Sequence, residues 1–326
     1  MSLPGFDAAG DRVRSLSETK RLALRRLLAD QNAEARLLEL EGSNLRQLRT
    51  GTGANLFVFP ATDGSVGYMT GYLPHIPKDW NVFGCQTPGL DGEREPSTSV
   101  EEIAAHTVRQ IRRVQPASPY HLAGNCMGGL PAFEAAHQLR AAGAEVGTVL
   151  HLMPTFQRSW KGLPTLDSLP TRALIDYGFI MERLLGEPVH LPLDAIAAAD
   201  EADRTDLAID VLIRHPGLAG VTAQTLRHRI EVYQANLQAM FTYRPDSDPD
   251  STLTVIAVGE EERDEDMIDL ESPYAAALRA VPPDRLRVQR VNAEAGSLFD
   301  CAEPHMSKIG AVLRDVLSNT LGEGRA

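Results

Sequence analysis

Several features that define common protein classes are scarce or missing in this sequence. Three cysteines occur in 326 residues, Cys85, Cys126 and Cys301, and none forms a C-x-x-C pair. So few cysteines, in an odd number, are typical of free thiols in a reducing compartment, so we expect a cytoplasmic protein. No apolar run reaches the roughly 18 residues that a membrane-spanning helix needs, and the N-terminus lacks the apolar core of a signal peptide. We therefore expect no association with a membrane.

Positive charge is also in short supply. The chain carries 32 Lys and Arg against 44 Asp and Glu, a formal net charge of -12. This balance argues against a nucleic acid or an anionic membrane as partner, since both repel an acidic protein. A small acidic carrier protein stays compatible if it docks on a local basic patch. Metal and cofactor motifs such as H-E-x-x-H, a P-loop or G-x-G-x-x-G after a strand are missing, so we expect no metal site and no bound cofactor.

What the sequence does contain is an alternation of short apolar runs with helical patterns. A Ser99-x-x-Glu102 capping box opens one helix, and Gly143 ends another. This order predicts an α/β fold with a mainly parallel, doubly wound sheet. The expected strands are 55–59, 82–84, 120–123, 148–153, 252–258 and 286–291, and the expected helices are 99–114, 129–142 and about 307–317.

Two regions depart from this alternation. Residues 1–54 read as an N-terminal helical linker segment, because a Ser15-x-x-Glu18 capping box precedes leucines at helical spacing and polar residues dominate from 42 to 55. From about 155 to 245 strand signals are missing and long helical stretches prevail. We interpret this region as a helical insertion, a candidate lid, within one domain that spans residues 55–326.

One short segment carries a chemical signature. Gly124-Asn-Cys126-Met-Gly128 stands between a predicted strand and a predicted helix, which is the setting of a nucleophile elbow with cysteine as nucleophile. Small residues are needed at 124 and 128 because strand and helix pass close together there. A helix N-terminus next to a thiol favours the thiolate and a developing oxyanion. A simpler interpretation is a tight turn with a small buried cysteine, but the strand–helix junction favours the elbow.

The same motif predicts two donors for an oxyanion. One is the backbone N–H of Met127, the residue after the nucleophile. The other usually comes from the loop after an early strand, here residues 60–64, within which we choose Ala61.

Residues 55–317 resemble the thioesterase domains of nonribosomal peptide and polyketide synthases, which have the α/β-hydrolase fold with a helical lid. The expected helix over residues 17–29 resembles the linker that follows a carrier domain. The resemblance implies an acyl or peptidyl chain presented as a thioester on the phosphopantetheine of a carrier protein. It is carried by residues 56–60 with Asp63 and Gly64, and by 82–90, 99–119, 131–139 and 303–305.

Three positions differ from what this resemblance implies for a catalytic triad. The family uses serine where this chain has Cys126. Its acid ends the strand after the elbow helix, where this chain has Met153. Its histidine corresponds here to Ser297, or to Ala295 if the loop is two residues longer.

A cysteine tolerates the loss of a base better than a serine does. A free thiol has a pKa of about 8.5, whereas a hydroxyl nucleophile depends on a general base. Because water also needs a base, this substitution favours transfer or cyclisation over hydrolysis. Candidate bases or acids elsewhere are His151, His305, Glu260 and Asp300, although each is also compatible with a purely structural or surface role.

Three functions follow as hypotheses. The first is an enzyme that accepts an acyl or peptidyl group on Cys126 and releases it by transfer or cyclisation. The second is a hydrolytic thioesterase, for editing or chain release, with an unrecognised base. The third is a non-catalytic module that binds a carrier protein or a peptide.

Overall fold

The computed structural model describes residues 43–152, 169–185, 187–246, 250–259, 275–292 and 305–323. The chain divides into two compact units, one built around a sheet and one made of helices. The sheet unit holds the described residues up to 152 and from 235 onward, and the helical unit holds those from 169 to 234.

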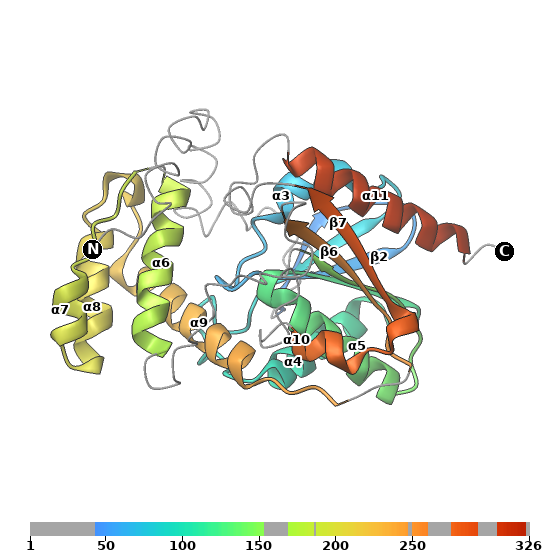
Figure 1. Ribbon diagram of the computed structural model, residues 1–326, viewed down its shortest axis with the longest axis horizontal. Helices are drawn as coiled ribbons and strands as arrows, with labels where there is room; N and C mark the ends of the chain where they lie inside the picture. Colours follow the sequence, from blue (N-terminus) through green and yellow to red (C-terminus); the bar gives the residue numbers. More distant parts are fainter. Residues whose placement is uncertain are drawn as a thin grey trace. The chain divides into compact units, whose positions relative to one another are not determined.

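The sheet unit confirms the predicted parallel architecture (Figure 1). Seven strands are ordered β1-β3-β2-β4-β5-β6-β7. All neighbours pair in parallel except β1, which runs antiparallel to β3. The strands are β1 Leu45–Arg49, β2 Asn55–Phe59, β3 Asn81–Cys85, β4 Tyr120–Asn125, β5 Val146–Leu152, β6 Leu253–Gly259 and β7 Leu286–Asn292.

Helices cover both faces of this sheet, as expected for a doubly wound fold (Figure 1). On one face lie α4 and α5, and Ser99 caps α4 by accepting the N–H of Glu102 at 3.2 Å, as its capping box predicts. On the other face, alternate strand residues such as Leu150 and Leu152 pack with Leu313 of α11 in one apolar cluster. The helices of this unit are α3 Met69–Tyr72, α4 Val100–Val114, α5 Gly129–Ala141, α10 Ala275–Ala280 and α11 His305–Glu323.

Strand β1 corrects part of the predicted linker. Residues 42–55 read as polar linker, but Leu45–Arg49 pairs with β3 at the edge of the sheet. The Arg49 guanidinium holds this edge by donating hydrogen bonds to the carbonyls of four residues that precede β3: Leu73, Ile76, Pro77 and Trp80. An edge strand with a single fully buried residue leaves little apolar signal in the sequence.

Replacing Arg49 by methionine is expected to lower the free energy of unfolding by roughly 2 kcal/mol, because several carbonyls lose their donor together. Urea unfolding at neutral pH measures this change. Arg112→Met is the matched control, because Arg112 is exposed on α4 and its loss is expected to have little effect. Equal stability of the two variants would contradict the anchoring role of Arg49.

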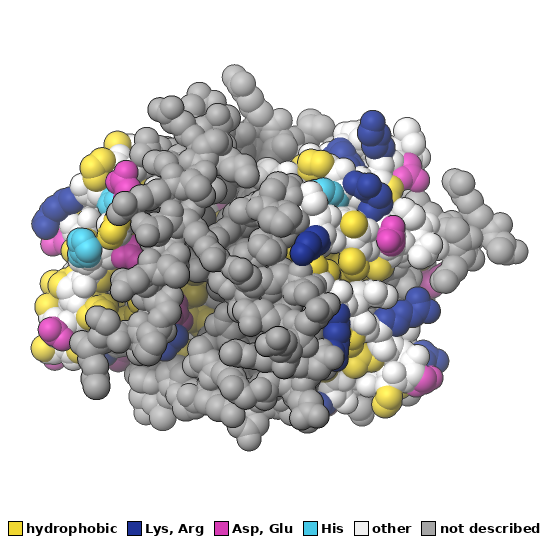
Figure 2. All heavy atoms as spheres, turned by 45° about the horizontal axis from the view of Figure 1, so that its top comes forward, with side chains coloured by type: hydrophobic (Ala, Val, Ile, Leu, Met, Phe, Trp, Pro, Cys, Tyr) yellow, Lys and Arg dark blue, Asp and Glu magenta, His cyan; other side chains and the backbone are white. Residues whose placement is uncertain are grey.

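The described residues of the helical unit form helices joined by short connections. It comprises α6 Leu169–Leu185, α7 Leu193–Ala198, α8 Glu201–Leu212 and the part of α9 Ala223–Thr242 that ends at Gln234. Tyr177 and Tyr233 meet edge to face at 5.7 Å between α6 and α9. Apolar side chains also reach the surface of this unit among charged ones (Figure 2). The exposed large ones are Phe179, Leu193 and Ile213.

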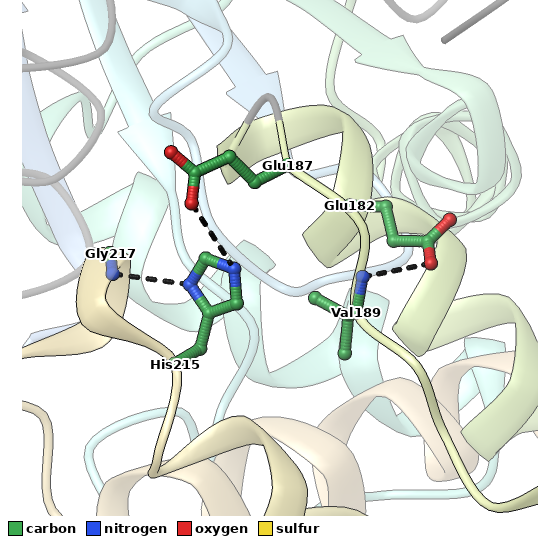
Figure 3. A network of polar contacts seen from close by, with 5 residues as sticks. All are labelled: Glu182, Glu187, Val189, His215 and Gly217. Atoms are coloured by element: carbon green, nitrogen blue, oxygen red, sulfur yellow. Dashed lines mark hydrogen bonds and ion pairs between the residues drawn. The ribbon is translucent and has the colours of Figure 1, made fainter.

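A polar network fastens the connections between these helices (Figure 3). The Gly217 N–H donates to Nδ1 of His215 at 3.1 Å, and Nε2 of the same ring lies 3.7 Å from a Glu187 carboxylate oxygen. Nearby, the Val189 N–H donates to the Glu182 carboxylate at 2.9 Å. The loop after α6 and the turn after α8 are thus held by side chains. Among the described helices, none is long and apolar enough to cross a membrane.

Candidate active site

Cys126 occupies the turn that joins β4 to α5, at the carboxyl end of the parallel strands. Its φ is 52°, and it is the non-glycine residue with positive φ in the described part of the chain. A left-handed conformation costs a side-chain-bearing residue roughly 1–2 kcal/mol. Such strain persists where the surroundings impose it, typically at functional sites. A 3-10 turn, Cys126–Gly128, then leads into α5 at Gly129. This geometry is that of a nucleophile elbow.

Three glycines make this turn possible. A Cβ on Gly124 would lie 2.0 Å from the Gly128 carbonyl oxygen, and one on Gly128 would lie 2.1 Å from the Pro60 carbonyl oxygen. A Cβ on Gly129 would lie 2.0 Å from the ring of His151. All of these are far inside normal contact distance. The small residues are therefore required by the close approach of β4, the loop after β2 and α5, as the motif predicts.

Cys126 is a partly exposed residue, and its sulfur lies next to the loop that follows β2. Oγ1 of Thr62 lies 3.9 Å from Sγ, which is long for a hydrogen bond to sulfur. Thr62 itself is buried, with 8% of its surface exposed. A hydroxyl and a thiol therefore face each other at the elbow, a contact that no sequence motif indicates.

The two predicted oxyanion donors belong to different segments, because Met127 follows Cys126 directly and Ala61 lies in the loop after β2. Met127 is buried in the first turn after the nucleophile. Ala61 forms a turn in which its carbonyl accepts the Gly64 N–H at 2.9 Å, and the residue after it is Thr62. The Tyr68 hydroxyl fixes the start of this loop by donating to the Phe59 carbonyl at 2.7 Å. The donor roles of Met127 and Ala61 remain predictions.

His151 contacts Cys126 through the backbone carbonyl of that residue. Its ring is fully buried on β5, and Nε2 lies 2.7 Å from the Cys126 carbonyl oxygen. Burial lowers the pKa of His151 to about 4, so the ring is neutral at pH 7 and Nε2–H donates to that carbonyl. A nitrogen that donates a proton to a carbonyl does not accept one from the thiol. In this geometry His151 supports the elbow rather than acting through Nε2 as the predicted base.

The remaining candidate groups are Glu260, Asp300 and His305. Glu260 and Asp300 lie outside the described residues, as do Met153 and Ser297 at the positions of the family acid and histidine. His305 begins α11, and its side chain is not described. Within the described segments, no group of three or more His, Cys, Asp or Glu is arranged to hold a metal ion.

Comparison with known families identifies the class to which this site belongs. Residues 54–267 match the model of the thioesterase domain family, which is well over half of the chain. The chain therefore belongs to the thioesterase domain family, and its sheet order and elbow agree with the α/β-hydrolase fold.

Individual relatives are large synthases. The bikaverin polyketide synthase bik1 of Gibberella fujikuroi is 40% identical over 96 residues, which are 29% of this chain and 5% of that protein. The vanchrobactin synthetase VabF of Vibrio anguillarum is 30% identical over 117 residues, 35% of this chain and 4% of that one. This chain thus matches only a small fraction of the length of these relatives.

Solved structures show the same fold. The four-domain nonribosomal peptide synthetase holo-AB3403, bound to AMP and glycine, superposes with a TM-score of 0.66 at 19% identity. The match covers 85% of this chain and 20% of that one. At this identity the likeness establishes the fold alone.

Proposed function

We propose that this chain processes acyl or peptidyl thioesters in nonribosomal peptide or polyketide biosynthesis, with Cys126 as the nucleophile. The observation that carries the proposal is the strained, partly exposed cysteine at the elbow of a thioesterase-family fold. The substrate is a chain tethered to the phosphopantetheine of a carrier protein, as the synthase relatives suggest.

The first step is a thioester exchange. The Cys126 thiolate attacks the carbonyl carbon, a new S–C bond forms, and the S–C bond to phosphopantetheine breaks. The proton lost by Cys126 ends on the departing phosphopantetheine thiol. The Met127 and Ala61 N–H groups stabilise the tetrahedral oxyanion between these two events.

The second step favours acceptors that are stronger nucleophiles than water. The Nε2–H of His151 is engaged by the Cys126 carbonyl, so it does not activate a water at the sulfur. An amine, a thiol or a carbanion needs less help to attack a thioester. We therefore propose transfer to such an acceptor, or cyclisation when the chain carries its own nucleophile, in preference to hydrolysis.

Intact-mass spectrometry with an acyl-loaded carrier protein tests the first step. Wild type is expected to gain one acyl mass on the peptide that contains Cys126, and Cys126→Ala to gain none. Cys126→Ser is expected to show background labelling, because a hydroxyl without a base is nearly inert. Cys85→Ala serves as the matched control, since Cys85 is buried and its removal is expected to leave the adduct unchanged.

The outcomes separate the three hypotheses. No adduct on wild type contradicts the proposal and favours a binding module. An adduct that persists in Cys126→Ala also contradicts the proposal. Free acid released well above the uncatalysed rate favours a hydrolytic thioesterase. Discharge of the adduct by an added small amine, with water hydrolysis at background, supports transfer.

A further inference from the structure

The loop after β2 places a threonine hydroxyl against the proposed nucleophile. Thr62 Oγ1 lies 3.9 Å from Cys126 Sγ. Among the described residues, this sulfur is the hydrogen-bonding partner of Oγ1. Thr62 is a buried residue at this position. A hydroxyl beside a sulfur stabilises a thiolate by donating a hydrogen bond to it.

Thr62 is itself held from a distant part of the chain. Asn236 of α9, in the part of that helix that belongs to the sheet unit, is fully buried and donates from Nδ2 to the Thr62 carbonyl at 2.9 Å. The same nitrogen lies 3.5 Å from Thr87 Oγ1. Oδ1 of Asn236 is buried without a hydrogen-bond partner among the described residues. Burying an amide oxygen without a hydrogen-bond partner costs free energy. A role in holding a functional loop explains why the protein retains that cost here.

We propose that Thr62 is a catalytic residue that stabilises the Cys126 thiolate with its hydroxyl, and that Asn236 is the positioning residue that keeps Thr62 in place. This inference rests on the proposed function of Cys126. It gives the cysteine a hydrogen-bond donor in a site where the Nε2–H of His151 is committed to the backbone. The 3.9 Å separation is expected to shorten when the sulfur carries the negative charge.

Alkylation of Cys126 by iodoacetamide, followed by peptide mass spectrometry, tests this without any acyl substrate. Thr62→Val removes the hydroxyl at constant shape and is expected to slow alkylation roughly tenfold at pH 7. At high pH, where the thiol is ionised in both proteins, the rates are expected to converge. Thr62→Ser keeps a hydroxyl and is expected to restore the rate at pH 7.

A purely structural role for Thr62 would change alkylation to a similar extent at every pH. If Thr62→Val is alkylated at the wild-type rate at pH 7, the proposal is overturned. It is also overturned if Thr62→Ser does not restore that rate. Because the probe is iodoacetamide alone, failure of the carrier assay contradicts the proposed function without contradicting the role of Thr62, and the reverse also holds.

Asn236→Leu, which leaves Thr62 in the chain, is expected to slow alkylation of Cys126 several-fold at pH 7. At high pH its rate is again expected to converge with that of wild type. Gln238→Leu, on an exposed position of the same helix, is the matched control and is expected to leave the rate unchanged. Equal rates for wild type and Asn236→Leu at pH 7, with the protein folded by circular dichroism, would exclude the positioning role.

Discussion

Gly128→Ala is expected to destabilise the protein by about 3 kcal/mol or more and to abolish selective reactivity of Cys126. The new Cβ would lie 2.1 Å from the Pro60 carbonyl oxygen and 2.8 Å from that of Phe59. Neither atom yields easily, because both belong to backbone at the end of a buried central strand. Overpacking of this kind forces the backbone to shift, and a shift here moves the elbow itself. Denaturant unfolding and iodoacetamide labelling measure the two effects.

Gly143→Ala separates steric conflict from backbone strain. Gly143 follows α5 with a φ of 78°, and a Cβ there would meet nothing within 4 Å. Alanine at this position is expected to cost only the roughly 1–2 kcal/mol of a left-handed conformation and to leave Cys126 labelling unchanged. If Gly128→Ala behaved like Gly143→Ala, the close approach at the elbow would be refuted.

Lowering the pH is expected to destabilise the folded protein through His151. Burial lowers the pKa of His151 to about 4, below its ordinary value of 6.5. Between these values the unfolded chain binds a proton that the folded chain does not, so the free energy of unfolding falls as the pH drops from about 6.5 to 4. Above about pH 6.5 the ring is neutral in both states, so the free energy of unfolding no longer depends on pH through His151. Integrated over that window, His151 alone contributes roughly 3 kcal/mol.

His151→Gln tests this assignment. Glutamine keeps an N–H donor for the Cys126 carbonyl but does not titrate, so the pH dependence of urea unfolding between pH 7.5 and 4.5 is expected to flatten. Part of the slope remains, because burial also lowers the pKa of His121 to about 4. His190→Gln, at an exposed position, is the control that keeps the full slope. An unchanged slope in His151→Gln would show that His151 is not the buried titrating group.

The sequence predicted those features that depend on neighbouring residues. Strand β2 was predicted with its observed bounds, because an apolar run that ends at a proline marks a buried parallel strand. The elbow was predicted from Gly124 to Gly128, since strand, turn and helix are contiguous there. Strand β1 was missed, because an edge strand needs only one buried residue.

Contacts between segments that are distant in the sequence were not predicted. Two-residue alternation along β5 does not show that Nε2 of His151 contacts the backbone carbonyl of Cys126. Thr62 lies within the loop in which Ala61 is the predicted oxyanion donor, but its hydroxyl was not predicted to contact the sulfur. Nothing local marks Asn236 in the middle of α9 as a residue that holds a loop.

By itself, then, the sequence determined the doubly wound fold, the elbow and the cysteine on it, because each is encoded in residues that are adjacent or regularly spaced. Only the tertiary structure decided what surrounds the sulfur. Thr62 and Cys126 are 64 positions apart, and Asn236 and Thr62 are 174 apart. Their contacts depend on how strands and helices pack, which spacing along the chain does not specify. The elbow is therefore readable from the sequence, whereas the hydroxyl that faces its sulfur required the folded chain.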